Sequence, residues 1–345
     1  MTVKLIHVGL GGWGGDWELN AIPPVKEVER VAVVDAHEPT LRKVQKLHGL
    51  PDAMCFTSLA DAMASVESDA VLVTAPMFAH VPVSLEALDA GKHVLVEKPF
   101  AGTVVEAKTA VDRAGELGLI LQVSQNYRFY PAPREAEKLL AAGAIGEPSV
   151  IEIDFRKWAN DAPVEGHRHY GIEHPLIFDM SIHHFDLIRK ITGQDAVKVY
   201  TRVLTPSWSN FKEEAAAAIT IELENGLIVS YRGSWISSGE PTKWGGDWSI
   251  QGNLGEIRFS TREGGTSGAA GDVLMLCERG GRPEPVALEK MDLWGRSAGL
   301  AAFANAINGG PTPETIGRAN LGSVALMEAA AKSSLSGQVE DVIIP

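Results

Sequence analysis

The chain has 345 residues, of which 45% are hydrophobic and 22% charged, as in an ordinary globular protein. Its formal net charge of −13 argues against nucleic acid or an anionic membrane surface as a partner. No apolar run approaches the ~20 residues of a membrane span, and two cysteines give no disulfide framework. We therefore expect a cytoplasmic protein without a signal peptide, and the length favours two domains.

The N-terminal segment predicts a dinucleotide-binding unit. Residues 3–8 read as a buried strand, which leads into Gly9-Leu10-Gly11-Gly12-Trp13-Gly14, a G-x-G-x-x-G sequence. Gly9 allows a tight turn, Gly11 lets the backbone approach a pyrophosphate, and Gly14 lets helix and strand pack closely. A second strand-like run, residues 31–34, ends at Asp35, near the ~20-residue separation expected for an acid that accepts from ribose hydroxyls.

Asp35 also predicts which dinucleotide is bound. Its negative charge would repel a 2′-phosphate, so we expect NAD rather than NADP. His37 and Arg42 follow closely and could weaken this preference.

Strand and helix patterns alternate through the rest of the first domain. Strands are predicted at residues 70–74, 92–97 and 119–123, and helices at 39–47, 58–64, 81–90 and 103–117. This alternation predicts a Rossmann domain over residues 1–125, with a doubly wound parallel sheet. Ligands bind at the carboxyl ends of such strands, so one edge should carry Gly9, Asp35, Thr74, Lys98 and Asn126.

A different pattern begins near residue 126. Helices are predicted at 134–142, 297–307 and 316–334, and strands at 149–158, 196–204, 215–223, 227–235, 248–251, 256–259 and 273–277. Asn225-Gly226 between two of these strands is a hairpin signal. Strands in succession with few helices between them predict a C-terminal α+β domain over residues 126–345, with a large, mostly antiparallel sheet.

Two groups of residues carry candidate chemistry. Lys98, in Glu97-Lys98-Pro99, follows a parallel strand and could stabilise negative charge on a substrate oxygen, although most lysines are simply exposed to solvent. Asp179, His183 and Asp186 share one face of a predicted helix, where His183 could exchange a hydroxyl proton. The alternative is a capping aspartate beside a buried, hydrogen-bonded histidine.

A metal site is a rival interpretation of the histidines in this region. His167, His169, His174, His183 and His184 lie close together in sequence, beside Asp179 and Asp186, and such ligands suit zinc. Neither an H-x-x-x-H sequence nor a pair of cysteines with ligand spacing accompanies them. We therefore expect no metal, and we interpret His167, His169, Tyr170 and Trp158 as polar and aromatic lining for a hydroxyl-rich ligand.

With these motifs in view, the chain resembles the glucose-fructose oxidoreductase / inositol dehydrogenase / MocA (Gfo/Idh/MocA) family. The resemblance runs nearly end to end and rests on these motifs: the glycine sequence with Asp35; Thr74-Ala75-Pro76 with His80; Ala90-Gly91-Lys92-His93-Val94 before Glu97-Lys98-Pro99; Asn126-Tyr127-Arg128; Gly143-Ala144-Ile145-Gly146; and the Asp179–Asp186 helix. Trp13, Gly15-Asp16-Trp17 and the additional His184 depart from the usual pattern.

The resemblance implies roles for the motif residues. His183 would be the acid/base, Lys98 would hold the reacting oxygen near the nicotinamide, and Asp179 would position the pair. The cofactor would be contacted by Gly9, Gly11, Gly12, Trp13, Gly14, Asp35, Thr74, Pro76, His80, Glu97, Lys98 and Asn126. Together with the lining residues inferred above from position and chemistry, the expected substrate contacts are Lys98, Arg128, Trp158, His167, His169, Tyr170, Asp179 and His183. The C-terminal sheet of this family is open and often forms an oligomer interface, so we expect a homodimer or homotetramer.

We therefore predict an NAD(H)-dependent oxidoreductase that transfers a hydride between the nicotinamide and a hydroxyl or carbonyl carbon of a sugar, polyol or related compound, bound between the two domains. One alternative is an NAD-dependent epimerase or glycosidase that oxidises its substrate transiently. Another is a non-enzymatic ligand sensor, against which the intact set of Lys98, Asp179 and His183 argues.

Overall fold

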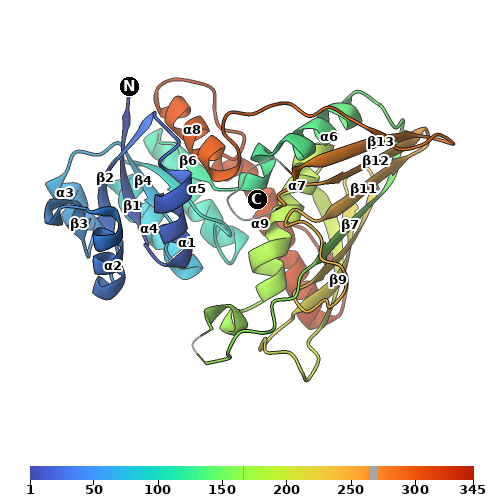
Figure 1. Ribbon diagram of the computed structural model, residues 1–345, viewed down its shortest axis with the longest axis horizontal. Coiled ribbons are helices and arrows are strands. Elements are labelled where there is room, and N and C mark those ends of the chain that lie inside the picture. Colours follow the sequence, from blue (N-terminus) through green and yellow to red (C-terminus); the bar gives the residue numbers. More distant parts are fainter. Residues whose placement is uncertain (166, 264–270) are drawn as a thin grey trace. The chain divides into compact units, whose positions relative to one another are not determined.

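The computed structural model describes residues 1–165, 167–263 and 271–345 (Figure 1). Contacts divide the chain into two compact units. Unit 1 contains Met1–Asn126, Gly295–Val324 and Pro345, and unit 2 contains Tyr127–Trp294 and Ala325–Ile344. A C-terminal segment thus packs with the N-terminal unit, which the sequence pattern alone did not indicate. No helix in the described part of the chain is long and apolar enough to cross a membrane.

Unit 1 is built on a six-stranded parallel sheet, which confirms the predicted Rossmann architecture. In spatial order its strands are β3 (Cys55–Phe56), β2 (Val28–Val34), β1 (Val3–Val8), β4 (Ala70–Val73), β5 (His93–Val96) and β6 (Leu121–Val123). The central strands β1, β4 and β5 are almost wholly buried, as expected for a parallel sheet covered on both faces. Their carboxyl ends lie at one edge of the sheet.

The helices of unit 1 are α1 (Gly12–Asp16), α2 (Glu38–His48), α3 (Leu59–Ser65), α4 (Met77–Asp89), α5 (Val104–Leu117) and α8 (Gly295–Ile307). A π-helical turn, η1 (Trp17–Ala21), continues α1, and a 3₁₀ turn, η2 (Asp52–Met54), precedes β3. The hydroxyls of Ser58 and Thr103 cap α3 and α5 as the sequence predicts. Helix α4 begins before the predicted residue 81 and contains Pro82.

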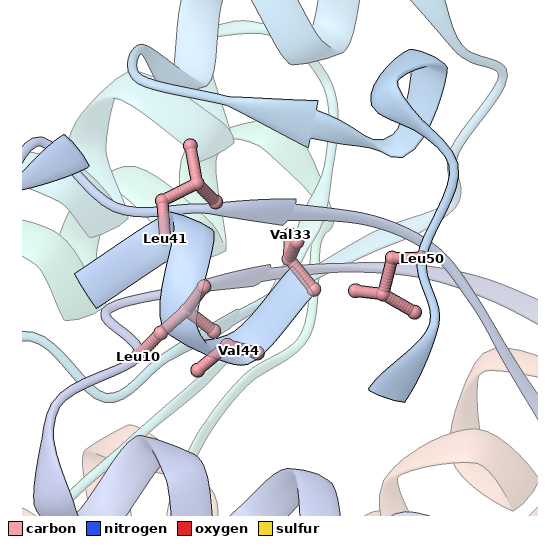
Figure 2. Close-up of a cluster of buried hydrophobic side chains, with 5 residues drawn as sticks. All are labelled: Leu10, Val33, Leu41, Val44 and Leu50. Carbon is pink, nitrogen blue, oxygen red and sulfur yellow. The ribbon is translucent and has the colours of Figure 1, made fainter. Parts of the chain in front are cut away.

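One part of the core shows how α2 is fixed to the sheet (Figure 2). Leu41 and Val44 are three positions apart, so they lie on the same face of α2. They pack with Leu10 of the glycine-rich turn and Val33 of β2. Gly49 ends the helix in a left-handed conformation, and Leu50 then joins the same cluster. This packing holds the glycine-rich turn next to the end of β2.

Unit 2 is built on a nine-stranded sheet, and its strand pairs are antiparallel except for β7 with β10. In order the strands are β14 (Glu284–Pro285), β13 (Val273–Glu278), β12 (Gly255–Ser260), β11 (Asp247–Gly252), β7 (Pro148–Arg156), β10 (Ile228–Ser234), β9 (Ala216–Leu223), β8 (Ala196–Leu204) and β15 (Glu340–Asp341). The predicted Asn225-Gly226 hairpin joins β9 to β10, with Gly226 at φ 82°. These pairings confirm the predicted mostly antiparallel sheet.

The other helical elements are η3 (Asn126–Phe129), α6 (Pro131–Ala141), η4 (Arg168–Gly171), η5 (Ile177–Ser181), α7 (Ile182–Thr192) and α9 (Gly317–Ser336). Helix α6 packs on α7, and most of α7 is buried. In strand β7 buried Ile151, Ile153 and Phe155 alternate with more exposed residues, so one face of the sheet belongs to the core.

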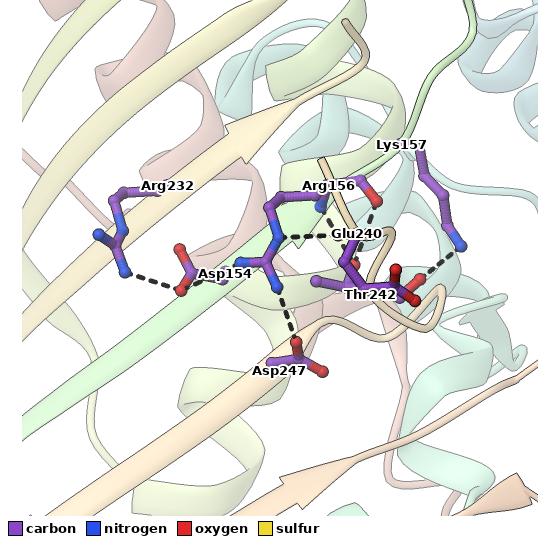
Figure 3. A network of polar contacts seen from close by, with 7 residues as sticks. All are labelled: Asp154, Arg156, Lys157, Arg232, Glu240, Thr242 and Asp247. Atoms are coloured by element: carbon purple, nitrogen blue, oxygen red, sulfur yellow. Dashed lines mark hydrogen bonds and ion pairs between the residues drawn. The ribbon is translucent and has the colours of Figure 1, made fainter. Parts of the chain in front are cut away.

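The other face of this sheet carries a polar network over β10, β7 and β11 (Figure 3). Asp154 of β7 accepts a hydrogen bond from Arg232 of β10 at 2.7 Å and lies 3.4 Å from Arg156. Arg156 also binds Asp247 of β11, at 3.1 Å. Such cross-strand pairs link three neighbouring strands, although exposed ion pairs contribute only about 0–1 kcal/mol each.

Candidate active site

The glycine-rich turn has the shape that a dinucleotide requires. Gly9 has φ +91°, and a Cβ there would lie 2.4 Å from the backbone nitrogen of Ala75. A Cβ at Gly14 would lie 1.8 Å from the carbonyl oxygen of Gly9. At Gly11 and Gly12 a Cβ would meet no described atom within 4 Å, so the backbone there is open to a ligand. Close packing at two glycines and open space at the other two suit a pyrophosphate.

Asp35 follows β2 directly, as predicted, and its carboxylate faces the glycine-rich turn. One carboxylate oxygen accepts from the backbone N–H of Leu10 at 2.7 Å, and the other accepts from that of His37 at 2.8 Å. These bonds fix the carboxylate, while each oxygen keeps a lone pair for a further donor. Its binding to ribose stays a prediction.

His80 lies between the turns that follow β4 and β5 at this edge. Thr74 and Pro76 follow β4, and Lys98 follows β5. The ring nitrogens of His80 lie 2.8 Å from the carbonyl oxygens of Ala75 and Pro99. Burial lowers the pKa of His80, and the two carbonyls oppose this. A neutral imidazole has one N–H, so His80 donates to one of these carbonyls while it packs between the turns that carry Thr74 and Lys98. Direct cofactor contact by its side chain stays a prediction.

Glu97 and Asn126, the other predicted cofactor residues, are both buried. The Glu97 carboxylate accepts from the indole N–H of Trp17 at 2.7 Å and from the backbone N–H of Lys98 at 3.0 Å. Trp13, in contrast, is 40% exposed, and the guanidinium of Arg296 lies 4.2 Å from its ring centre. Sequence spacing did not predict the Trp17–Glu97 bond, because the two residues are 80 positions apart in the chain.

In unit 2 the proposed acid/base His183 stands in the first turn of α7. Its ring stacks on that of Tyr127, with ring centres 4.0 Å apart and ring planes 4° apart. Arg262 binds the Tyr127 hydroxyl, and its guanidinium lies 4.9 Å from the Tyr127 ring centre. The packing of Tyr127 and Arg262 around His183 could not be read from sequence spacing.

Asp179 and Asp186 have different surroundings from each other. Asp179 lies in the π-helical turn η5, where one carboxylate oxygen is 3.4 Å from Nε2 of His169. Asp186 is buried, and its two oxygens accept from Arg128 at 2.5 and 2.8 Å. The guanidinium of Arg128, a predicted substrate contact, is thus committed to this pair. A substrate contact by Arg128 stays a prediction.

His184 has a structural environment. It is fully buried, packs on Phe155 and Trp248, and lies 3.3 Å from the Tyr231 hydroxyl. Burial lowers its pKa from 6.5 to about 3, so it is neutral near pH 7. The same burial raises the pKa of Tyr231. His184 therefore helps to pack α7 against the sheet.

The other predicted substrate residues lie in the segment before α7 and at the end of β7. The ring of His167 packs on Tyr170, and His169 packs edge-to-face on Phe211 and Trp235. Tyr170 is buried, and its hydroxyl accepts from the backbone N–H of Ala162 at 3.1 Å. Trp158 is 43% exposed and stacks on the exposed Trp208.

Among the described residues, one group has ligand atoms close enough to hold a metal ion. It consists of His174, Glu213 and Glu214, whose atoms lie within 4.8 Å of one another. His174 is 2.9 Å from Glu214, which raises its pKa. This group differs from the histidine set considered from the sequence, with which it shares only His174.

Known proteins resemble the chain over nearly its whole length. Residues 3–125 match the oxidoreductase family with an NAD-binding Rossmann fold, and residues 133–258 match the GFO/IDH/MocA C-terminal domain. The scyllo-inositol 2-dehydrogenase (NAD(+)) of Bacillus subtilis is 31% identical and aligns over 68% of this chain and 68% of its own length. The 1,5-anhydro-D-fructose reductase of Ensifer adhaerens is 25% identical and aligns over 83% of each.

A solved structure shows the same fold. It is an oxidoreductase from Agrobacterium radiobacter in complex with NAD+, L-tartaric acid and magnesium, with a TM-score of 0.83, 23% identity and 99% of both chains covered. The two family matches fall on the two domains whose sheets are described above, and the open glycine-rich turn lies in the domain matched as NAD-binding. The chain belongs to the GFO/IDH/MocA family of NAD-binding oxidoreductases.

Proposed function

We propose that the protein moves a hydride between NAD(H) and a hydroxyl-bearing carbon of a sugar, a polyol or a related compound. The observation that carries the proposal is the pairing of an NAD-type turn in unit 1 with a His183 whose ring is held in place in unit 2. The names of the two curated relatives support the substrate class, since one acts on a polyol and the other on a sugar derivative.

NAD is proposed as the cofactor rather than NADP. Gly9, Gly11, Gly12, Trp13 and Gly14 would hold the pyrophosphate, and Asp35 would accept from the ribose hydroxyls. The remaining part of NAD would be contacted by Thr74, Pro76, His80, Glu97, Lys98 and Asn126. When bound, the nicotinamide supplies the hydride acceptor or donor.

The side chains would handle the proton and the charge. His183 accepts the hydroxyl proton during oxidation, and Asp179 orients the catalytic pair. Lys98 donates a hydrogen bond to the reacting oxygen and stabilises its developing negative charge. Because Lys98 and His183 belong to different units, neither unit alone is expected to catalyse the reaction. A homodimer or homotetramer in the cytoplasm is the proposed assembly and setting.

Single substitutions test these roles. Lys98→Ala and His183→Ala should each lower kcat by about 100-fold or more, the size expected for a lost electrostatic or acid/base group. NADH binding to His183→Ala should match wild type, because the substitution is outside unit 1. His184→Gln is the matched control: it should lose stability while kcat stays within a few-fold. Near wild-type turnover by His183→Ala would remove the acid/base assignment.

A further inference from the structure

Trp17 and Glu97 form a buried bond between two turns at the carboxyl edge of the unit 1 sheet. Trp17 follows α1 and is fully buried, and Glu97, directly after β5, is 4% exposed. The indole N–H donates to one carboxylate oxygen at 2.7 Å, and the other oxygen accepts from the backbone N–H of Lys98 at 3.0 Å. The turn η1, which follows α1, is thus connected to the Lys98 backbone through one carboxylate.

The Trp17 side of this connection is itself held firmly. The next residue, Glu18, lies 2.7 Å from His7 of β1, and the other ring nitrogen of His7 lies 2.8 Å from the Thr74 hydroxyl. Arg30 of β2 donates to Glu18 at 2.7 Å. These bonds anchor η1 to β1 and β2, and His7 is itself fixed to Thr74, directly after β4, so Trp17 is a rigid donor.

A buried carboxylate is costly unless its oxygens have donors, and a donor that is fixed in space also fixes the carboxylate. Glu97 in turn fixes the backbone N–H of Lys98, the residue whose ammonium group the proposed function assigns to the reacting oxygen. Small displacements of such a group lower turnover strongly, because stabilisation of the reacting oxygen depends on distance and direction.

We propose that Trp17 is a positioning residue for Lys98 and acts through Glu97. This rests on the proposed function, which makes Lys98 a catalytic residue. It also accounts for Trp17, one of the residues after the glycine-rich turn that depart from the family's usual pattern. A purely structural Trp17, filling the core, is the competing explanation.

Substitutions that keep the ring but change the donor separate the two explanations. Trp17→Phe removes the N–H and should lower kcat about tenfold, with KM and the Kd for NADH close to wild type. Trp17→His keeps a ring N–H and should recover part of the loss. The control is Trp248→Phe, because the buried Trp248 indole donates to the Gly245 carbonyl at 2.8 Å. This control should lower stability and leave kcat unchanged.

A double-mutant cycle with Glu97→Gln tests whether Trp17 acts on Lys98 through Glu97. If Trp17 acts through Glu97, the losses in kcat from Trp17→Phe and Glu97→Gln are not additive, whereas independent structural effects add. Additive losses, or equal kcat in Trp17→Phe and wild type, would overturn the proposal. The assay uses whichever sugar or polyol gives the fastest NADH formation in wild type.

A second measurement needs neither substrate nor cofactor. Lysines are reductively methylated with ¹³C, and the NMR signal of Lys98 is identified by its loss in Lys98→Arg. This signal should move in Trp17→Phe and Glu97→Gln and stay in place in Trp248→Phe; an unmoved signal in both test variants contradicts the coupling. If Trp17→Phe does not fold, the position of the Lys98 signal in the nearly isosteric Glu97→Gln variant decides whether the coupling exists. A normal kcat in Lys98→Ala would instead refute the proposed function.

Discussion

Asp35 is the residue on which the cofactor preference should depend. Its carboxylate is fixed by two backbone N–H groups at the glycine-rich turn. We predict tighter binding of NADH than of NADPH, because the fixed negative charge repels a 2′-phosphate. Asp35→Ser should reduce the difference in affinity between NADH and NADPH. Asp35→Asn, which keeps the shape of the side chain and removes its charge, should reduce this difference too. Dissociation constants from fluorescence titration check this, and tighter NADPH binding by wild type would refute it.

The buried His184 should make the free energy of unfolding depend on pH. Burial lowers its pKa from the ordinary 6.5 to about 3 in the folded protein. Between these pH values the unfolded chain therefore binds a proton that the folded protein does not. This contribution to stability is therefore complete above about pH 6.5 and is lost as the pH falls toward 3. The slope from one such group is about 1.4 kcal/mol per pH unit.

Urea unfolding of wild type and His184→Gln between neutral and mildly acidic pH measures this slope. The variant should be less stable at pH ~7 but lose less stability on acidification, since glutamine does not titrate. Parallel pH profiles for the two proteins would show that His184 does not cause the effect.

At the scale of elements, the Arg128–Asp186 pair connects η3 to α7. Both side chains are buried and the contact is bidentate. Asp186→Asn should cost about 3–5 kcal/mol, because it leaves a buried guanidinium without its countercharge. The double variant Arg128→Met with Asp186→Leu should recover much of the loss, since an apolar pair replaces the charges. Denaturant unfolding checks both, and a loss below about 1 kcal/mol would contradict a strong pair.

Sequence patterns predicted the elements well wherever local physics decided them. Buried apolar runs marked β1, β4 and β5, glycines marked the turn after β1, and Ser58 and Thr103 marked helix starts. The π-helical turns escaped prediction because a single inserted residue leaves little periodic signal. The Trp17–Glu97 bond and the Tyr127–His183 stack escaped it because they join distant positions, which one sequence does not reveal.

At the scale of the whole molecule, the proposed chemistry needs no metal. We predict that chelation leaves turnover unchanged, because the proton and charge are handled by His183 and Lys98. The group of His174, Glu213 and Glu214 makes this a real test, since it could hold an ion. Metal analysis of protein purified without an affinity tag checks it. One tightly bound equivalent, with activity lost on chelation and restored by the metal, would overturn the metal-free mechanism.

Hydride transfer can be followed directly with deuterium-labelled substrates. Wild type is incubated with NAD+ and a panel of sugars and polyols, including scyllo-inositol, each carrying deuterium on a hydroxyl-bearing carbon. We predict that at least one compound forms NADH containing deuterium, and that Lys98→Ala and His183→Ala slow this transfer about 100-fold. Deuterium that leaves the substrate and returns without net NADH would indicate transient oxidation. Absence of any deuterium transfer to the nicotinamide across the panel would contradict hydride transfer to NAD as the activity of this protein.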